Sequence, residues 1–181
     1  MNKAREKVLW LWPANKLFES SIKFLISESS LVTNNNFIIV VDFNVGNTRE
    51  IVINEKGLFS KDLSRDCIVF LADEHTLPIA NYYERKYGHV FKSTTVMLNS
   101  HVDTIRDEII NAVEPASPVS YGCRENLESL NNEEYFLLRE LLRGRDITSI
   151  ANIIKMNRKS LYSRRNALLT KLKVPSIFAL I

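Results

Sequence analysis

The sequence has no apolar run of about eighteen residues, the length at which a membrane-spanning helix becomes possible. The apolar segment near the N-terminus, Val8–Trp12, is too short for the core of a signal peptide. We therefore expect a soluble, cytoplasmic protein without a membrane partner.

Cysteine, histidine and glycine are scarce as well. The two cysteines, Cys67 and Cys123, lie far apart and outside any CxxC pair, which predicts reduced thiols rather than a disulfide or a zinc site. His75, His89 and His101 do not have metal-ligand spacing. Five glycines occur, with no glycine-rich phosphate loop, GxSxG motif or catalytic Cys/His pattern. The sequence therefore predicts no enzyme, no metal and no cofactor.

Acidic residues are absent from the last part of the chain. All 21 Asp and Glu residues lie at or before Asp146, whereas seven of the 24 Lys and Arg residues follow it. These seven are Lys155, Arg158, Lys159, Arg164, Arg165, Lys171 and Lys173. Residues 1–146 thus hold 17 cations against 21 anions, a net charge of −4, and the last 35 residues carry +7. This asymmetry indicates an end that binds a polyanion.

Residues 8–113 alternate between strand and helix patterns. Two continuous apolar runs, Phe37–Val41 and Cys67–Ala72, are typical of parallel strands buried on both faces. Other strands are expected at Val8–Trp12 and His89–Lys92, and helices at Lys16–Ser27, Ile79–Tyr87 and Thr95–Val113. Thr48–Ser64 is ambiguous, because Ile51–Ile53 favours a strand and Leu58–Leu63 a helix. The pattern predicts an α/β domain with a parallel sheet and right-handed crossovers.

A linker is predicted after this domain. Residues 114–129 contain Pro115, Pro118, Gly122 and several Ser and Asn residues, and they lack apolar periodicity. We therefore expect an α/β domain at residues 1–113 and an all-α domain at residues 130–181.

Three short helices are predicted between Leu130 and Val174. Asn131 and Glu134 have the spacing of a capping box for the first, and Gly144 supplies the left-handed residue that ends it. Asp146 and Asn157 cap the second and third. The predicted core positions are Leu137, Leu138, Leu141, Leu142, Ile147, Ile150, Ala151, Ile154, Leu161, Leu168 and Leu172. A tight turn between two helices, as predicted at Lys155–Asn157, is typical of a helix-turn-helix.

The second helix of such a pair enters the major groove of DNA. On the helix Arg158–Lys173, the face opposite the leucines carries Lys159, Tyr162, Ser163 and Asn166, with Arg164 and Arg165 on the flanks. Asn can form two hydrogen bonds to adenine, Tyr can donate to a phosphate or stack at a base edge, and cations suit phosphates. The alternative is an ordinary solvated face, which is less favoured because these cations have no acidic partners at i,i+4.

This segment resembles, without a gap, the C-terminal DNA-binding domain of LuxR/FixJ-type (GerE-like) bacterial transcription regulators. The matching positions are Glu134, Leu138, Leu141, Gly144, Ile150, Ala151, Ile154, Lys159, Ser160, Leu161, Leu168, Lys171, Leu172 and Val174. The resemblance implies that Tyr162, Ser163 and Asn166 contact bases. It implies that Lys159, Ser160, Arg164 and Arg165 contact phosphates.

Two departures from the family pattern affect function. The family usually has Lys or Arg at the position of Tyr162 and His or Tyr at that of Arg164, so the target sequence is not inherited from a relative. The family's fourth helix, a common dimer surface, is reduced here to Ser176–Ile181. Pairing through that surface is therefore left open.

The order of elements in residues 8–113 resembles a shortened phosphorylatable receiver domain. Asp42 stands at the end of a predicted strand, at the place where a receiver has its phosphoacceptor aspartate. Lys92 stands at the end of a later predicted strand, at the place where a receiver has its signature lysine. Trp12–Asn15 replaces the acidic pair that holds Mg²⁺, and Ala72 replaces the switching Ser or Thr. We expect a degenerate receiver in which Asp42 and Lys92 form an ion pair or are plain strand-end polar residues. Phosphorylation of Asp42 and a small-molecule pocket are the alternatives.

Six aromatic residues offer a surface for protein pairing, with an ordinary core as the equal alternative. They are Trp10, Trp12, Tyr82, Tyr83, Tyr87 and Phe91. The Trp-containing four-residue motif ending in Thr-Arg, through which some relatives bind a cyclic dinucleotide, does not occur.

Together these patterns predict a bacterial, sequence-specific transcription regulator that binds double-stranded DNA as a homodimer and is controlled without phosphorylation. Two alternatives remain. One is an adaptor or anti-regulator that forms a heterodimer with a related regulator, and the other is a response regulator phosphorylated on Asp42.

Overall fold

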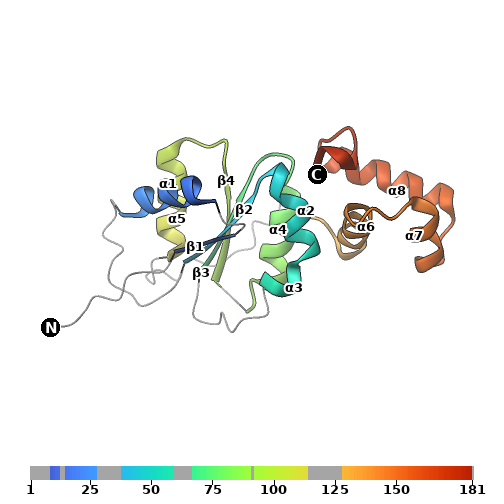
Figure 1. The fold of residues 1–181 in the computed structure, drawn as a ribbon, viewed down its shortest axis with the longest axis horizontal. Helices are drawn as coiled ribbons and strands as arrows, with labels where there is room; N and C mark the ends of the chain where they lie inside the picture. Colours follow the sequence, from blue (N-terminus) through green and yellow to red (C-terminus); the bar gives the residue numbers. More distant parts are fainter. Residues whose placement is uncertain are drawn as a thin grey trace.

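The computed structural model describes residues 9–12, 15–27, 38–58, 67–90, 92–113 and 128–180. Four parallel strands form one sheet in the order β1-β2-β3-β4 (Figure 1). The strands are β1 (Leu9–Trp12), β2 (Ile38–Phe43), β3 (Cys67–Ala72) and β4 (Lys92–Met97). Within the described residues, no helix is long and apolar enough to cross a membrane.

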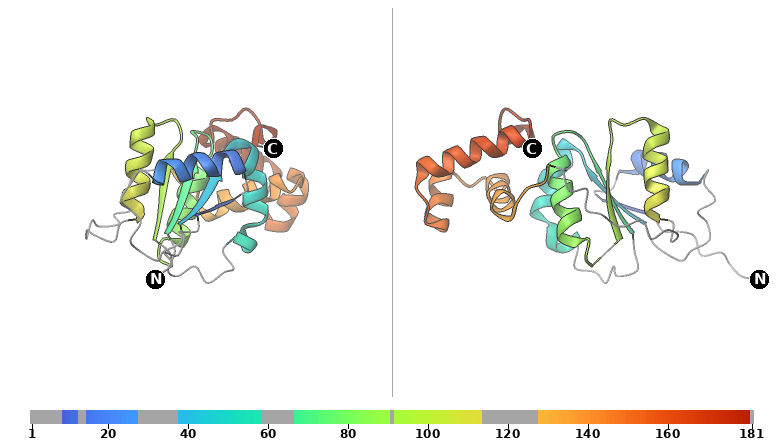
Figure 2. Two further views of the ribbon diagram at one scale, coloured as in Figure 1. Left: turned by 60° about the vertical axis from the view of Figure 1, so that its left-hand side comes forward. Right: turned by 180° about the vertical axis from the view of Figure 1, so that it is seen from behind.

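Helices cover both faces of the sheet (Figure 2). On one face lie α1 (Lys16–Ser27) and α5 (Val102–Val113), and on the other lie α2 (Val45–Ile53) and α4 (Leu77–Tyr87), with the short α3 (Glu55–Leu58) after α2. The central strands β2 and β3 are buried along their whole length. Alternate residues of each strand therefore contribute to different apolar clusters, which explains the continuous apolar runs in the sequence.

The position of α1 corrects the prediction of uniformly right-handed crossovers. The chain moves in one direction across the sheet from β1 to β4, yet α1 lies on the opposite face from α2 and α4. Three crossovers of one hand would leave all three helices on the same face. In a receiver-type sheet of order 2-1-3-4-5, the first helix does lie opposite the next three. Removal of its second strand and the following helix leaves the arrangement seen here, a shortened receiver-like sheet.

The C-terminal part is all-α. It consists of α6 (Asn132–Leu142), α7 (Ile147–Ile154), α8 (Arg158–Lys171) and the 3₁₀ turn η1 (Ile177–Leu180). The predicted starts are confirmed, because the side chains of Asn131, Asp146 and Asn157 each accept a hydrogen bond from a backbone N–H of the helix that follows. Asn131 and Glu134 form the expected capping box, and Gly144 has the left-handed φ of +82°.

The all-α part packs on the α2 and α4 side of the sheet (Figure 1). Helix α2 contacts both α6 and η1, and one continuous apolar cluster includes Ile51 of α2, Leu142 of α6 and Leu180 of η1. The two parts therefore share a core. The domain boundary predicted at residues 114–129 falls largely outside the described residues and stays a prediction.

The region around β4 differs from the sequence prediction. The strand expected at His89–Lys92 is a turn up to Val90, and the strand begins at Lys92 and runs to Met97. The helix expected from Thr95 begins only at Val102. Leu98 lies four residues before Val102, a helical spacing, but it belongs to the turn after β4. Val96 is extended because β4 pairs with β3 along all six of its residues.

The segment Thr48–Ser64 was ambiguous, and its strand alternative is wrong. Ile51–Ile53 lies inside α2, which starts where the Asn44 side chain accepts a hydrogen bond from the backbone N–H of Asn47 at 3.0 Å. Ile51 and Val52 are fully buried against the sheet. Tertiary burial and a helix cap thus override the strand propensity of these β-branched residues.

Candidate nucleic-acid interface

Helices α7 and α8 are joined by a tight turn. The turn Lys155–Asn157 uses a left-handed residue at Lys155, with φ of 53°, and Asn157 then caps α8 by accepting a hydrogen bond from the backbone N–H of Lys159 at 2.8 Å. Three leucines of α8, Leu161, Leu168 and Leu169, are buried against the other helices. The side of α8 opposite these three leucines therefore faces outward.

The predicted reading residues are brought together on this outward side. Lys159, Ser160, Tyr162, Ser163, Arg164 and Asn166 are exposed, and Arg165 is half-buried. Tyr162 keeps 53% of its surface exposed although it is a large aromatic residue. The ring and the hydroxyl of Tyr162 are therefore accessible from this side of α8.

Some cations of this surface have acidic partners that the sequence prediction did not foresee. Arg164 pairs with Glu133 of α6, and Lys171 Nζ lies 2.8 Å from Glu134 Oε2. Lys173 Nζ lies 3.8 Å from Glu74 Oε2. The seven cations have no acidic residue at i,i+4, as the sequence indicated, but three of them find acidic partners on other elements.

Four of the seven cations keep their charge uncompensated within the described part of the chain. No carboxylate lies within ion-pair distance of Lys155, Arg158, Lys159 or Arg165 there. Arg158, Lys159 and Arg165 belong to the first eight of the fourteen residues of α8. Both side chains of the ion pair of Arg164 with Glu133 are exposed, so this pair adds little stability.

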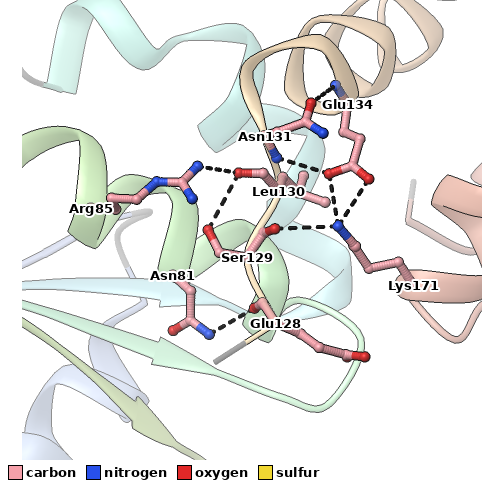
Figure 3. Close-up of polar contacts among 8 residues, drawn as sticks. All are labelled: Asn81, Arg85, Glu128, Ser129, Leu130, Asn131, Glu134 and Lys171. Atoms are coloured by element: carbon pink, nitrogen blue, oxygen red, sulfur yellow. Dashed lines mark hydrogen bonds and ion pairs between the residues drawn. The ribbon is translucent and has the colours of Figure 1, made fainter. Parts of the chain in front are cut away.

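The segment that enters α6 is held between the sheet domain and α8 (Figure 3). Asn81 of α4 donates to the backbone oxygen of Glu128 at 2.9 Å, and Arg85 of α4 donates to that of Leu130. From the other side, Lys171 Nζ donates to the backbone oxygen of Ser129 at 3.3 Å. These contacts connect α4 to the C-terminal end of α8.

A buried carboxylate strengthens the same interface. Glu55 accepts hydrogen bonds from Tyr87 at 2.7 Å, from Tyr135 of α6 at 2.8 Å and from Lys86. Burial raises the pKa of Glu55, but these hydrogen bonds outweigh burial and hold the pKa below its usual value. The Tyr135 hydroxyl also lies 2.7 Å from that of Tyr83.

Sequence reasoning missed Glu55 and misjudged the aromatic residues around it. Tyr82 and Tyr83 are buried, and the ring of Tyr82 stacks on that of Tyr135 with centroids 4.2 Å apart. For these residues and Tyr87 the core alternative is correct, whereas Phe91 and the side chains of Trp10 and Trp12 lie outside the described residues. Glu55 and Tyr135 are 80 residues apart, so no local signal pairs them.

The surroundings of Asp42 differ from those of a receiver phosphoacceptor. Its carboxyl is 3% exposed and accepts hydrogen bonds from the amides of Asn44 at 2.7 Å and Asn47 at 2.9 Å. Burial raises the pKa of Asp42 above its usual value. Asp42 lies in register with Leu71, whereas Lys92 pairs with Cys67 at the other end of β3. Both predictions for Lys92, the signature lysine and the ion pair with Asp42, are therefore wrong.

Asp42 also borders a shallow hollow, where the small-molecule alternative would apply. The hollow is lined by Asn15, Leu17, Phe18, Ser21, Asp42, Asn44 and Leu98. Among the described residues, no group of three His, Cys, Asp or Glu side chains is arranged to hold a metal ion. The receiver requirement for a carboxylate pair that binds Mg²⁺ is thus not met in that part of the chain.

Solved structures of response regulators resemble the chain over nearly its whole length. Full-length FixJ from B. japonicum has a TM-score of 0.39 and 16% identity, with 97% of this chain and 94% of that chain covered. RcsB in a DNA complex has a TM-score of 0.43 and 14% identity, with 95% and 94% covered. RcsB from Salmonella enterica serovar Typhimurium, bound to promoter rprA in the presence of phosphomimetic BeF3-, has a TM-score of 0.41 and 14% identity, with 96% and 99% covered.

A search of curated proteins finds no match. A protein-family model, described as the EcpR N-terminal domain, matches residues 1–113, which include the whole sheet and all the helices on both of its faces. Because this match spans more than half of the chain, the protein belongs to the EcpR N-terminal domain family.

Proposed function

We propose that this protein is a sequence-specific, DNA-binding transcription regulator of the LuxR type that reads double-stranded DNA with α8. The observation that carries the proposal is the division of α8 into two sides. Leucines are buried on one side, and the other side is exposed and carries cations, a tyrosine and an asparagine. The described part of the chain contains no comparable cationic helix face on the sheet domain.

In the proposed complex the part of α8 from Arg158 to Asn166 lies in the major groove. The amide of Asn166 forms two hydrogen bonds to an adenine, and Ser163 and Tyr162 contact neighbouring base edges. Lys159 and Arg165 bind phosphates directly, and Arg164 does so by exchanging Glu133 for a phosphate, with Ser160 as a further donor. Helix α7 crosses the backbone beside the groove.

Regulation without phosphorylation is part of the proposal. Asp42 is buried, and its Oδ2 oxygen already accepts hydrogen bonds from the side-chain amides of Asn44 and Asn47. Asp73, the nearby acid, uses its Oδ1 oxygen to accept from the backbone N–H groups of His75 and Thr76 at 2.9 Å, so it orders the turn that precedes α4. This arrangement leaves a phosphoryl group without the Mg²⁺ site and the lysine that neutralise its charge in a receiver.

The proposed regulator acts in the cytoplasm as a homodimer. One observation favours a second candidate, an adaptor or anti-regulator that pairs with a related regulator. Ile177 and Leu180, at the place of the family's fourth helix, are buried against α2 of the same chain. Size measurement of the protein alone and with short duplexes separates the two candidates. A monomer without salt-dependent duplex binding contradicts the homodimeric regulator.

Single substitutions in α8 test the assigned roles. Asn166→Ala is expected to reduce the preference for a selected site over scrambled DNA, at a cost of about 1–3 kcal/mol. Lys159→Ala is expected to weaken both duplexes equally and to lower the salt slope of log K by about one. Fluorescence anisotropy on both duplexes at several salt concentrations measures these changes.

Two exposed residues of the sheet domain, Asn99 and Lys56, supply the matched controls. Asn99→Ala and Lys56→Ala remove the same chemical groups far from α8, and both are expected to leave binding unchanged. Equal losses on the two duplexes for Asn166→Ala and Lys159→Ala would contradict the separate roles.

A further inference from the structure

The shallow hollow beside Asp42 lies at the carboxyl ends of the parallel strands. Asp42 is the last residue but one of β2, Leu98 directly follows β4, and Asn15 directly precedes α1. Helices α1 and α2 cover opposite faces of the sheet (Figure 2). In open α/β sheets, ligands bind in the crevice that such a divergence of helices creates. The hollow has a volume of about 350 Å³, which is within the range of small-molecule sites.

The side chain of Asp42 points to the side of the sheet where the hollow lies. Val40, two residues earlier on β2, packs in the apolar cluster beneath α1 and α5, and residues two apart on a strand share a face. The Oδ2 oxygen of Asp42 accepts from Asn44 and Asn47, whereas its Oδ1 oxygen has no hydrogen-bond partner within the described residues. Because buried carboxylate oxygens are normally paired, Oδ1 is open to a donor from outside the chain.

The charge of the hollow determines which ligands it can accept. Among the seven described residues that line it, only Asp42 is charged. Burial raises the pKa of Asp42, and the nearby negative charge of Asp73 raises this pKa as well. An anionic ligand would therefore meet repulsion without a compensating cation. A cationic ligand would instead stabilise the ionised form of Asp42.

Three apolar side chains form the rest of the wall. Phe18 and Leu98 are half-buried, and Leu17 is 81% exposed. A hydrocarbon group that packs against them removes apolar surface from water on both partners. A buried acid next to apolar side chains thus matches a small molecule with a cationic group at one end and a hydrocarbon part at the other.

We propose that this hollow binds a small organic cation, whose ammonium group donates a hydrogen bond to Asp42 Oδ1 and whose hydrocarbon part packs against Phe18 and Leu98.

Asp42 also connects the hollow to the C-terminal helices. Its Oδ2 oxygen accepts from Asn44, which caps α2, and from Asn47 in the first turn of α2. Helix α2 packs against α6 and η1, and its Arg49 Nε donates to the backbone oxygen of Leu142 at 3.1 Å. Resting on the proposed DNA binding, the second part follows: the bound cation stabilises α2, and with it the arrangement in which α8 faces outward, and so strengthens DNA binding.

Titration of the ¹⁵N-labelled full chain with hexylammonium chloride, followed by NMR, tests the site. The backbone amide signals of Phe18, Asn44 and Leu98 are expected to shift in a saturable way, with a dissociation constant on the order of 1 mM. Hexanoate has the same chain length and the opposite charge, and it is expected to cause no saturable shift. Equal binding of the two compounds, or no saturable shift with hexylammonium, would overturn the proposal.

Two substitutions with matched controls locate the binding. Asp42→Asn keeps the shape of the side chain and removes its charge, so it is expected to raise the dissociation constant of hexylammonium more than about tenfold. Asp107→Asn is its control, because Asp107 lies on α5 outside the hollow with a 64% exposed side chain.

Ser21→Phe places a ring in the hollow and is expected to weaken binding to a similar extent, whereas Ser20→Phe, on an exposed neighbour outside the hollow, is not. The NMR spectrum of each variant verifies that the fold is retained. Binding that survives both Asp42→Asn and Ser21→Phe would overturn the proposed site.

Fluorescence anisotropy with a labelled duplex tests the second part. Saturating hexylammonium is expected to tighten duplex binding of the wild type about fivefold or more, relative to the same concentration of sodium chloride, and to leave that of Asp42→Asn unchanged. Bound hexylammonium that leaves duplex binding unchanged or weakens it would overturn this part. A chain that binds hexylammonium and no duplex would contradict the proposed DNA-binding function and leave the hollow as a binding site, so the two failures are distinguishable.

Discussion

Tyr135→Phe removes one hydroxyl from the contact between the sheet domain and α6 while the ring remains. That hydroxyl donates to Glu55 Oε2 at 2.8 Å and lies 2.7 Å from the hydroxyl of Tyr83. The stacking of the ring on Tyr82 is retained, so no large cavity forms. Loss of a hydrogen bond to a buried charged group costs about 1.5–3 kcal/mol, so we expect the free energy of unfolding to fall by about 2 kcal/mol.

The pH dependence identifies the cause of this loss. The pKa of Glu55 is lowered in the folded protein, so its ionised form contributes stability above the unfolded pKa. That contribution disappears as the pH falls through the folded pKa. Without the Tyr135 hydroxyl the folded pKa of Glu55 rises, and the difference between variant and wild type therefore shrinks in acid.

Urea unfolding at neutral pH and near pH 4 measures both effects. Tyr162→Phe is the matched control, because Tyr162 is exposed on α8 and its loss of a hydroxyl should change stability by less than about 0.5 kcal/mol. A Tyr135→Phe variant as stable as wild type at neutral pH would refute the role assigned to Glu55. A loss of equal size at both pH values would refute the electrostatic explanation.

Three further predictions follow from single positions. Gly144→Ala forces a side chain into a φ of +82° and should cost about 1 kcal/mol in urea unfolding, although a Cβ there meets no atom within 4 Å. Asp42→Asn should raise the free energy of unfolding at neutral pH and flatten the dependence of that free energy on pH. The reason is that the pKa of Asp42 is raised in the folded state, so the wild-type protein loses stability as the pH rises through that pKa. Beryllofluoride with Mg²⁺ should change neither the oligomeric state nor the DNA affinity, as measured by sedimentation and anisotropy, and a change in either would show a working phosphorylation site.

The C-terminal helices could be predicted from sequence because their signals are local. Each helix start depends on a side chain two or three residues from the N–H that it caps, as with Asn131, Asp146 and Asn157. Gly144 ends α6 for a similarly local reason, its left-handed backbone. The core leucines follow helical spacing, so their burial was predictable as well.

The sheet domain was only partly predictable because its remaining features depend on distant residues. Lys92 begins β4 rather than ending a strand, and only the pairing with Cys67 reveals this. The ion pair of Arg164 with Glu133 and the bonds of Glu55 with Tyr135 join residues on different elements. Sequence spacing carries no signal for such contacts, so the ion pairs and hydrogen bonds between the sheet domain and the C-terminal helices could be identified only from the structure.

In the proposed function the exposed side of α8 reads DNA sequence. Selection of bound duplexes from random DNA by the full chain, followed by competition between the selected and a scrambled duplex, measures this property. We expect a defined sequence to emerge, the wild type to prefer it, and Asn166→Ala to lose much of this preference. Selection without any enriched sequence, or a preference that Asn166→Ala leaves intact, would contradict the proposed function.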